Sequence, residues 1–311
     1  MLDSWDVIIV GGGPAGLNAA LVLGRCRRKV LVVDEGKPRN AKSHALHGFL
    51  SRDCIPPNEL LEIGRSQLNA YPTVTLRHGR IKSALRTDNG FYIQAEDGIE
   101  FYTRKLLLAG GVVDQLPKQP GFRELYGIAV FHCPYCDGWE MRDQPIAVYG
   151  HGDAKGAGMA LEMTIWNQDI VLCTDGPADL NQESRDQLAR HGIAIREEKI
   201  LHLSHGKDIT PYHTPFDIVF ESGPPLSRAA IFFNTTRSQS NDIAVNLGCN
   251  TCDVKGCRID NSQQMSDVPG LYIAGDASGE VLQAIVAAAE GVKAAMGINT
   301  ALLIEDLAKI I

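Results

Sequence analysis

The chain has 311 residues, of which 44% are hydrophobic and 22% charged, with 31 glycines and a formal net charge of -7. This length predicts about two domains with a sizeable core, and the acidic balance argues against a dedicated nucleic-acid binder. No segment approaches the ~18 consecutive apolar residues that cross a bilayer, and the first residues carry no signal-peptide pattern. We therefore expect a cytoplasmic α/β protein with neither a membrane nor a nucleic acid as its partner.

The chain opens with a predicted strand, a glycine loop, a helix and a second strand. The run 5–10 is apolar and rich in β-branched residues, which indicates a buried strand. The glycine-rich loop 11–16 follows, then a helical stretch over 17–27 and an apolar strand over 29–33. Together they have the size of a complete strand–helix–strand unit, about thirty residues.

The glycine loop has the spacing of a dinucleotide-binding turn. Gly11 permits the tight turn, Gly13 lets the backbone approach a diphosphate, and Gly16 lets the helix pack on the strand. Asp34 ends the second strand, where a carboxylate can accept hydrogen bonds from an adenosine ribose. The alternative is an ordinary glycine-rich turn. Strand, helix and acid at these distances favour dinucleotide binding.

The unit recurs in the middle of the chain, which predicts an α/β fold with two Rossmann-like nucleotide-binding domains. The simplest layout is one nucleotide domain over 1–115 and 239–311, interrupted by a second over 116–238. The polar run 238–241 would be the return linker. The other predicted elements are strands over 105–109, 145–149, 169–173 and 270–274, and helices from the second glycine loop to about 168 and over about 281–301.

Cys133 and Cys136, in the run Cys-Pro-Tyr-Cys, lie at a predicted turn into a helix. Two thiols at this spacing can close a short disulfide, and a helix terminus lowers the pKa of a thiol. We interpret them as a redox-active pair. The alternatives are half of a zinc site, which would need two further ligands, and two inert buried cysteines.

A second group of cysteines is Cys249, Cys252 and Cys257. We interpret it as packing or an accidental cluster, with a relay dithiol or a partial metal site as alternatives. No metal is expected in this protein. Isolated buried thiols are expected at Cys26, Cys54 and Cys173.

Three ordered motifs resemble the low-molecular-weight thioredoxin reductase family: the opening Gly-Gly-Gly-Pro-Ala-Gly, the central Cys-Pro-Tyr-Cys-Asp-Gly and the late run 269–284. The resemblance covers nearly the whole chain. It implies a discontinuous FAD-binding domain, a second domain that carries the redox pair, a thioredoxin-like or other disulfide partner, and a homodimer. It also implies which residues contact FAD: Gly11, Gly13, Gly16 and Asp34 at the adenosine and diphosphate, Gly275 and Asp276 at the ribityl chain, Gln283 and Ala284 along the isoalloxazine and, on a looser match, His47 with Gly48 and Phe49 beside the flavin.

The resemblance further assigns roles around the redox pair. Cys136 would face the flavin and Cys133 would attack the disulfide of the partner. Asp137 would donate a proton to the departing thiolate, a role compatible with the alternative of capping the following helix. Similar small-molecule dithiol oxidases often have histidine after the pair, so Asp137 favours a protein disulfide.

The middle glycine loop departs from the family pattern. Gly150 and Gly152 are retained as a possible second nucleotide site, but the sixth position is Lys155, with Gly156 one place late. A long side chain there should push the helix away or force a shifted turn. The next strand is followed by Asp175 and no basic residue, whereas reductases that use NADPH have a cationic cluster for its 2′-phosphate.

These departures predict an enzyme that does not use NADPH in the usual way. NADH, ferredoxin or another electron donor, and a second FAD in the middle domain, are the alternatives. Tyr149, His151 and Trp166 would either stack on such a second nucleotide or simply pack. Alternative functions are a small-molecule dithiol oxidase that uses oxygen and a flavin redox sensor without turnover.

Overall fold

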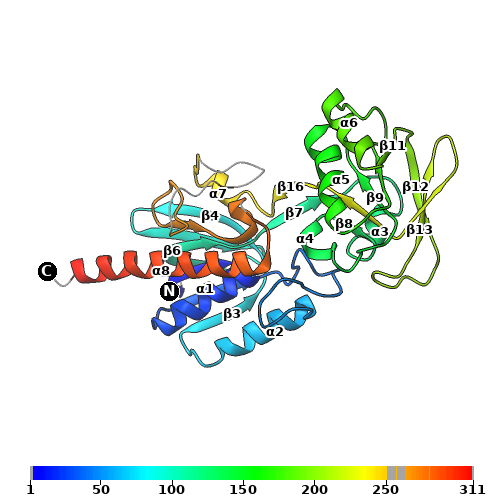
Figure 1. Cartoon of the computed structure of the whole chain (residues 1–311). Helices are drawn as coiled ribbons and strands as arrows, with labels where there is room; N and C mark the ends of the chain where they lie inside the picture. The colour runs from blue at the N-terminus through cyan, green and yellow to red at the C-terminus, as the bar shows by residue number, and fades with distance from the viewer. Residues whose placement is uncertain (1–2, 251–256, 258–262, 280, 310–311) are drawn as a thin grey trace. The chain divides into compact units, whose positions relative to one another are not determined.

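The structure is a computed structural model that describes residues 3–250, 257, 263–279 and 281–309 (Figure 1). Its contacts divide the chain into two compact units, and each unit is built around its own parallel sheet. Unit 1 comprises the chain up to Ala41, Asn58–Asp114 and the chain from Arg237, and unit 2 comprises Lys42–Pro57 and Gln115–Thr236.

Seven strands form one sheet in the described part of unit 1. β1 (Asp3–Val10) pairs in parallel with β2 (Val30–Asp34) on one side and with β6 (Glu100–Leu108) on the other. β3 (Val74–His78) extends the sheet beyond β2, and β17 (Leu271–Ile273) pairs with the end of β6. Because these five strands are parallel, their carboxyl ends lie along one edge of the sheet.

The rest of this sheet is an antiparallel extension. β4 (Ile81–Thr87) pairs with β5 (Gly90–Ala95), and β5 pairs with the first half of β6. Together with α7 (Ile243–Asn246), these strands contribute apolar side chains to the core on one face of the sheet.

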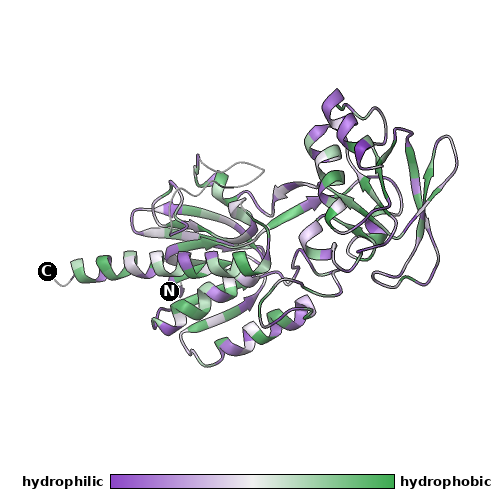
Figure 2. Cartoon of the chain, in the orientation of Figure 1, coloured by the Kyte–Doolittle hydropathy of each residue, from purple (hydrophilic) through white to green (hydrophobic). Residues whose placement is uncertain are grey.

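Three helices bury their apolar sides against the opposite face: α1 (Pro14–Arg25), α2 (Pro57–Leu68) and α8 (Ala284–Ala308). Figure 2 shows α1 as a mainly hydrophobic helix. It lies in close contact with α8 at Gly291, where an added Cβ would be only 2.1 Å from the Ala15 carbonyl oxygen. Any side chain at Gly291 would therefore separate the two helices.

The main sheet of unit 2 contains five parallel strands in the order β11–β10–β9–β15–β8. Its central strands are apolar and buried, as expected for a parallel sheet covered on both faces. Their bounds are Ile146–Tyr149 (β9), Ile170–Cys173 (β10), Ala194–Arg196 (β11), Ala230–Phe233 (β15) and Val130–Phe131 (β8).

A smaller antiparallel sheet and short helices complete unit 2. The sheet consists of β12 (Ile200–His205), β13 (Phe216–Phe220) and β14 (Leu226–Arg228). The helices are α3 (Phe122–Leu125), α4 (Pro134–Asp137), the π-helix η1 (Asp153–Gly158), α5 (Met159–Glu162), the 3-10 helix η2 (Met163–Ile165) and α6 (Gln182–Arg190).

The chain crosses between the units on a pair of strands. β7 (Val112–Gln115) leads out of unit 1 and pairs with the returning β16 (Thr236–Gln239). The predicted return linker, 238–241, overlaps the end of β16. Residues 42–57 were predicted as part of the discontinuous nucleotide domain (1–115 and 239–311), whereas their contacts group them with unit 2.

The predicted α/β fold with two Rossmann-type units is confirmed, as is the succession of strand, glycine loop and helix, which occurs at β1–α1 in unit 1 and at β9–η1 in unit 2. None of the described helices is long and apolar enough to cross a membrane.

Candidate active site

The first glycine loop connects β1 to α1 and has no room for side chains at two positions. Gly11 has φ +106°, and a Cβ added there would lie 2.3 Å from the Ala109 carbonyl oxygen. At Gly16 an added Cβ would lie 1.9 Å from the Gly11 carbonyl oxygen, whereas at Gly13 it would meet nothing within 4 Å. The loop is therefore packed tightly on the sheet side and open where α1 begins.

That opening suits a diphosphate. Gly13 is the N-cap of α1, and as a glycine it has no side chain that could accept hydrogen bonds from the first N–H groups of the helix. These N–H groups and the positive end of the helix dipole therefore face the open side of the loop. Asp34, at the end of β2, lies beside the loop: its Oδ1 accepts a hydrogen bond from the Gly12 N–H at 3.0 Å, and its Oδ2 lies 3.2 Å from Arg65 Nη2.

Gly275 and Asp276 follow β17 and lie at the carboxyl edge of the sheet, where the first glycine loop also lies. A Cβ added at Gly275, whose φ is +75°, would lie 3.0 Å from the Cβ of Ala15 in α1. The Gly275 N–H and the Ser278 hydroxyl both donate to the buried Glu290 carboxylate, at 2.7 and 3.0 Å. Glu290 thereby holds the short helix η3 (Gly275–Ser278) in place.

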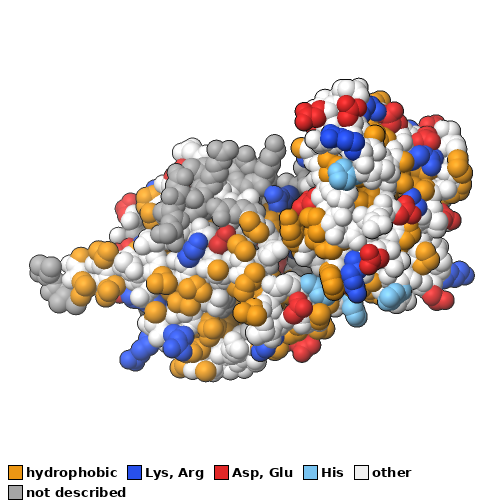
Figure 3. Space-filling model, viewed as in Figure 1, with side chains coloured by type: hydrophobic (Ala, Val, Ile, Leu, Met, Phe, Trp, Pro, Cys, Tyr) orange, Lys and Arg blue, Asp and Glu red, His pale blue; other side chains and the backbone are white. Residues whose placement is uncertain are grey.

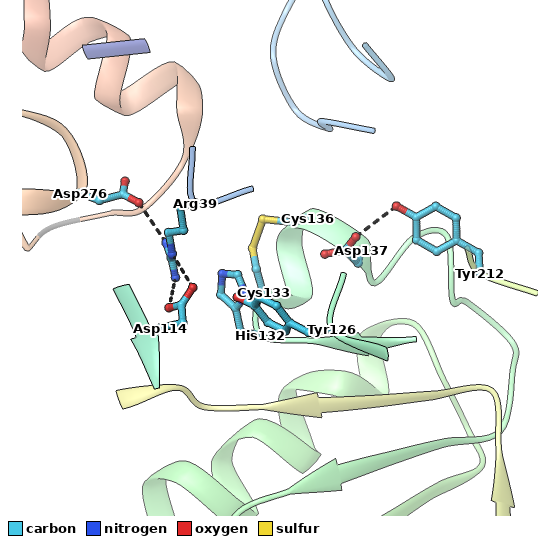
Figure 4. Close-up of a disulfide and its surroundings, with 9 residues drawn as sticks. All are labelled: Arg39, Asp114, Tyr126, His132, Cys133, Cys136, Asp137, Tyr212 and Asp276. Carbon is cyan, nitrogen blue, oxygen red and sulfur yellow. Dashed lines mark hydrogen bonds and ion pairs between the residues drawn. A yellow bond between two sulfur atoms is a disulfide. The ribbon is translucent and has the colours of Figure 1, made fainter. Parts of the chain in front are cut away.

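Asp276 belongs to an ion-pair group that sequence reasoning missed. Arg39 donates to both Asp114 oxygens at 2.7 Å and to Asp276 Oδ2 at 3.0 Å (Figure 4). These residues come from three segments of unit 1, and no local pattern connects them. Of the predicted flavin contacts at the start of α8, Gln283 is its N-cap and Ala284 its first residue.

The redox pair lies in unit 2 and forms a disulfide, with Cys133 Sγ and Cys136 Sγ 2.04 Å apart (Figure 4). Cys133 is the N-cap of α4, and Pro134 occupies its first turn, where a missing N–H costs nothing. Two neighbouring aromatic side chains are exposed, Tyr135 by 65% and Trp139 by 63%. A partner protein approaching the disulfide would meet these aromatic groups.

Asp137 is the last residue of α4 and is half-buried. Burial raises its pKa to about 7, with Glu140 adding to the rise and a hydrogen bond from Tyr212 opposing it. The Tyr212 hydroxyl donates to Asp137 Oδ1 at 3.2 Å (Figure 4). A carboxyl group with this pKa can give and take a proton near neutral pH.

His47 lies in the segment of unit 2 that an antiparallel bridge between Leu46 and Ile55 closes. Its Nδ1 is 3.6 Å from Glu140 Oε1 and 3.7 Å from Cys54 Sγ. The structure does not group His47 with the glycine loop of unit 1. Together with Asp53 and Cys54, His47 presents potential metal-ligand atoms within 4.8 Å of one another, but exposed groups of this kind are common without an ion.

Of the two outcomes expected from Lys155, a displaced helix or a shifted turn, the second glycine loop contains the shifted turn. The π-helix η1 closes with a hydrogen bond from the Ala157 N–H to the Gly152 carbonyl at 3.2 Å. Because a π-turn contains one extra residue, Gly156 takes the packing position, and a Cβ added there would lie 3.0 Å from the Gly150 carbonyl oxygen. Lys155 is exposed, so its side chain does not separate helix and strand.

The same loop is covered by the segment that follows β10. The Gly152 N–H donates to the Ala178 carbonyl at 2.8 Å. The Asp153 carboxylate accepts hydrogen bonds from the Asn181 N–H at 3.0 Å and from its side-chain amide at 2.9 Å. A diphosphate on this loop would face an engaged N–H and a carboxylate.

The polar residues after β10 and β11 are engaged with one another as well. Asp175 accepts hydrogen bonds from the Ile200 N–H and the Gln119 amide, at 2.7 and 2.6 Å. The nearby cations already face carboxylates: Arg185 lies 3.3 Å from Glu197, and Arg196 lies 2.9 Å from Glu198. Of the aromatic candidates, Tyr149 packs edge-on against Phe122 at 5.1 Å, Trp166 packs edge-on against Tyr135 at 5.8 Å, and His151 is exposed.

The remaining cysteines are the predicted cluster of Cys249, Cys252 and Cys257 and the three single thiols Cys26, Cys54 and Cys173. Cys249 and Cys257 are buried, Cys257 is disulfide-bonded, and Cys252 lies outside the described residues. The expected burial of Cys173 is confirmed, and burial raises its pKa to about 12. For Cys26 and Cys54 that expectation is wrong, because both are exposed.

Comparisons with known proteins agree with this architecture. Residues 5–291 match the model of the pyridine nucleotide-disulphide oxidoreductase family. The structure of an oxidoreductase from Agrobacterium tumefaciens is similar, with a TM-score of 0.88 and 30% identity over 97% of this chain and 99% of that one. Thioredoxin reductase of Aquifex aeolicus is 27% identical over 95% of this chain and 92% of its own.

The fold also matches a thioredoxin reductase structure from Streptococcus pyogenes, with a TM-score of 0.85 and 20% identity over 97% of this chain and 99% of that one. The family implies FAD and nucleotide binding. The chain thus belongs to the pyridine nucleotide-disulphide oxidoreductase family and is a thioredoxin reductase-like, FAD-dependent disulfide oxidoreductase.

Proposed function

We propose that this enzyme passes two electrons between FAD in unit 1 and the Cys133–Cys136 disulfide in unit 2, and then to a thioredoxin-type protein disulfide. The observation that carries this proposal is a disulfide at a helix start followed directly by Asp137, a half-buried aspartate whose pKa is raised to about 7. Curated relatives named thioredoxin reductase support the choice of partner.

The residues of unit 1 fit FAD. An open helix N-terminus at Gly13 suits its diphosphate, Asp34 suits the adenosine ribose, and Asp276, held by Arg39, suits the ribityl chain. Gln283 and Ala284 would lie along the isoalloxazine, and His47 would approach it from the segment 42–57. When bound, FAD supplies an acceptor and donor of electron pairs close to the protein.

The cysteines and Asp137 then perform the thiol chemistry. Reduction by two electrons breaks the S–S bond, and Asp137 gives its proton to Cys136 as negative charge forms there, leaving Cys133 as the thiolate. The Cys133 thiolate attacks the disulfide of the partner and expels one partner thiolate, giving a mixed disulfide. The Asp137 carboxylate then takes the proton back from Cys136, whose thiolate attacks the mixed disulfide, expels the second partner thiolate and restores the Cys133–Cys136 disulfide, while the two partner thiolates take up protons from water.

The electron donor is, in this proposal, not NADPH bound in the usual way. The Gly152 N–H is engaged, the Asp153 carboxylate would repel a phosphate, and the guanidinium groups of Arg185 and Arg196 already face carboxylates. The first two features also argue against a second FAD on this loop. Ferredoxin is a donor that would need no such loop.

The decisive experiment follows the flavin absorbance in anaerobic stopped-flow mixing. We expect rapid bleaching with reduced thioredoxin, which runs the reaction backwards, and with a ferredoxin-type donor. Rapid bleaching by NADPH or NADH would contradict the donor proposal. One extracted flavin per chain is expected, whereas a ratio near two would indicate a second FAD.

Two alternative functions have distinct outcomes in related assays. Oxygen consumption with small dithiols, and none with reduced thioredoxin, would identify a small-molecule dithiol oxidase. Flavin that exchanges electrons without sustained turnover would identify a redox sensor. The Asp137 carboxyl beside the disulfide favours turnover, because a sensor needs no proton donor with a pKa near 7.

A further inference from the structure

Tyr212 is held in an unusual backbone conformation next to the redox pair. It lies in the connection between β12 and β13 and has φ +62°, which is rare for a bulky side chain. Its N–H donates to the Ile128 carbonyl at 3.1 Å, and its ring stacks on Phe131 at 5.7 Å with an interplanar angle of 20°. Strain of this kind persists where the surroundings impose it, and it often marks a functional position.

The conformation brings the Tyr212 hydroxyl to Asp137, which is 75 positions away in the sequence. Burial and the neighbouring Asp137 raise the pKa of Tyr212, so the tyrosine remains protonated and acts as donor at every physiological pH. A donor to a carboxylate favours its ionised form. Tyr212 therefore opposes the effect of burial on Asp137.

Other titratable groups face this pair within unit 2. Glu140 raises the pKa of both Asp137 and Tyr212, and Cys54 contributes to the rise at Tyr212. The rings of His44 and His47 each lie 6.5 Å from the Tyr212 ring. Burial and Glu140 raise the pKa of Asp137, and the hydrogen bond from the Tyr212 hydroxyl opposes this rise.

We propose that Tyr212 is a positioning residue for proton transfer at the redox pair, its hydroxyl orienting the Asp137 carboxyl toward the cysteines. The proposal rests on the proposed role of Asp137 as proton donor. It adds a function to a tyrosine from a distant loop that no sequence motif identifies, and it gives a role to the unusual backbone conformation at Tyr212.

The test compares Y212F with Y126F. Tyr126 is a matched control because it is a half-buried tyrosine of the same unit whose hydroxyl lies 2.9 Å from His132 Nδ1. Infrared difference spectra of the oxidised holoenzyme, recorded across pH, identify the Asp137 carboxyl band by its loss in D137N. Circular dichroism and flavin content verify that each variant is folded.

In Y212F we expect Asp137 to titrate about one pH unit higher than in the unaltered enzyme, with the alkaline limb of dithiol exchange moving in parallel. Y126F should titrate like the unaltered enzyme. Unchanged titration in Y212F, or an equal shift in Y126F, would overturn the proposal. If the band shifts in Y212F but D137N retains full activity, the contact is real and the proposed role of Asp137 fails instead.

Discussion

The Gly152 N–H donates to the Ala178 carbonyl at 2.8 Å, joining the second glycine loop to the chain that follows β10. In a nucleotide-binding loop this N–H would face a diphosphate. Here the protein's own backbone satisfies it, and the Asp153 carboxylate bonds to the same covering segment. The loop is therefore closed by contacts that a bound dinucleotide would have to break.

This closure predicts that NADPH does not stabilise the protein. A ligand at a hundred times its dissociation constant adds about 2.7 kcal/mol to the free energy of unfolding and raises the melting temperature by several degrees. We expect no such rise with NADPH or NADH in thermal unfolding of the holoenzyme, whereas excess FAD added to flavin-depleted protein should raise it. A rise of several degrees with NADPH would contradict the prediction.

Replacing the proton donor should slow thiol exchange. We expect D137N to reduce the rate by about a hundredfold to a thousandfold, and D143N, which alters an exposed aspartate nearby, to leave it unchanged. In the unaltered enzyme the protonated form of Asp137 predominates below its pKa of about 7. The exchange rate should therefore fall as pH rises through 7, and in D137N this fall in the pH–rate profile should be absent.

The first glycine loop allows a paired test of backbone packing. G16A places a methyl group 1.9 Å from the Gly11 carbonyl oxygen, so α1 must move. We expect a loss of roughly 2 kcal/mol or more in the free energy of unfolding, measured by urea titration, together with loss of bound flavin. When the variants are compared as flavin-depleted proteins, G13A, with nothing within 4 Å of the new methyl group, should unfold like the unaltered protein. Equal unfolding of the two variants would refute this account.

An ion-pair cluster near the end of α8 predicts sensitivity to acid. Arg104 lies 2.9 Å from Glu305 and 2.7 Å from Asp306. Hydrogen bonds from Arg28 and Arg104 hold the pKa of Asp306 below its ordinary value, and those from Lys105 and Arg104 outweigh burial to lower that of Glu305.

A carboxyl group with a lowered folded-state pKa stabilises the protein above its unfolded-state pKa, and this stability is lost as pH falls through the folded-state value. R104A should therefore cost about 1 kcal/mol at neutral pH, because the pairs are partly exposed, and less in acid. R86A, at an exposed arginine on β4, serves as the control. Urea titrations at neutral and acidic pH would reveal the difference, and a cost for R104A that is the same at both pH values would contradict it.

The family resemblance implies a homodimer, and we expect exposed hydrophobic side chains of α8 to take part in its interface. Figure 3 shows hydrophobic side chains along this helix, and Ile304 is exposed by 64%. We expect I304E to shift the mass measured by light scattering toward the monomer. L201E, at a hydrophobic residue of unit 2 that is exposed by 50%, should leave the mass unchanged. A monomeric unaltered enzyme would exclude the dimer.

The sequence by itself determined the parts of the protein that depend on short-range geometry. A strand, glycines at three fixed positions and a helix are compatible with few backbone paths, so the loop 11–16 could be predicted, whereas at Lys155 the sequence left a displaced helix and a shifted turn both open. The Cys133–Cys136 disulfide was predictable for the same reason, because a helical turn brings the two thiols together.

Tertiary structure alone decided the contacts between distant segments. Arg39 meets Asp114 and Asp276, and Tyr212 meets Asp137, because separate strands and loops converge within one unit. Such a pair involves two ordinary polar residues whose spacing along the chain carries no information about their distance in space. Burial acts in the same way: the near-neutral pKa of Asp137 depends on groups packed around it from other segments, and its position after Cys136 does not reveal it.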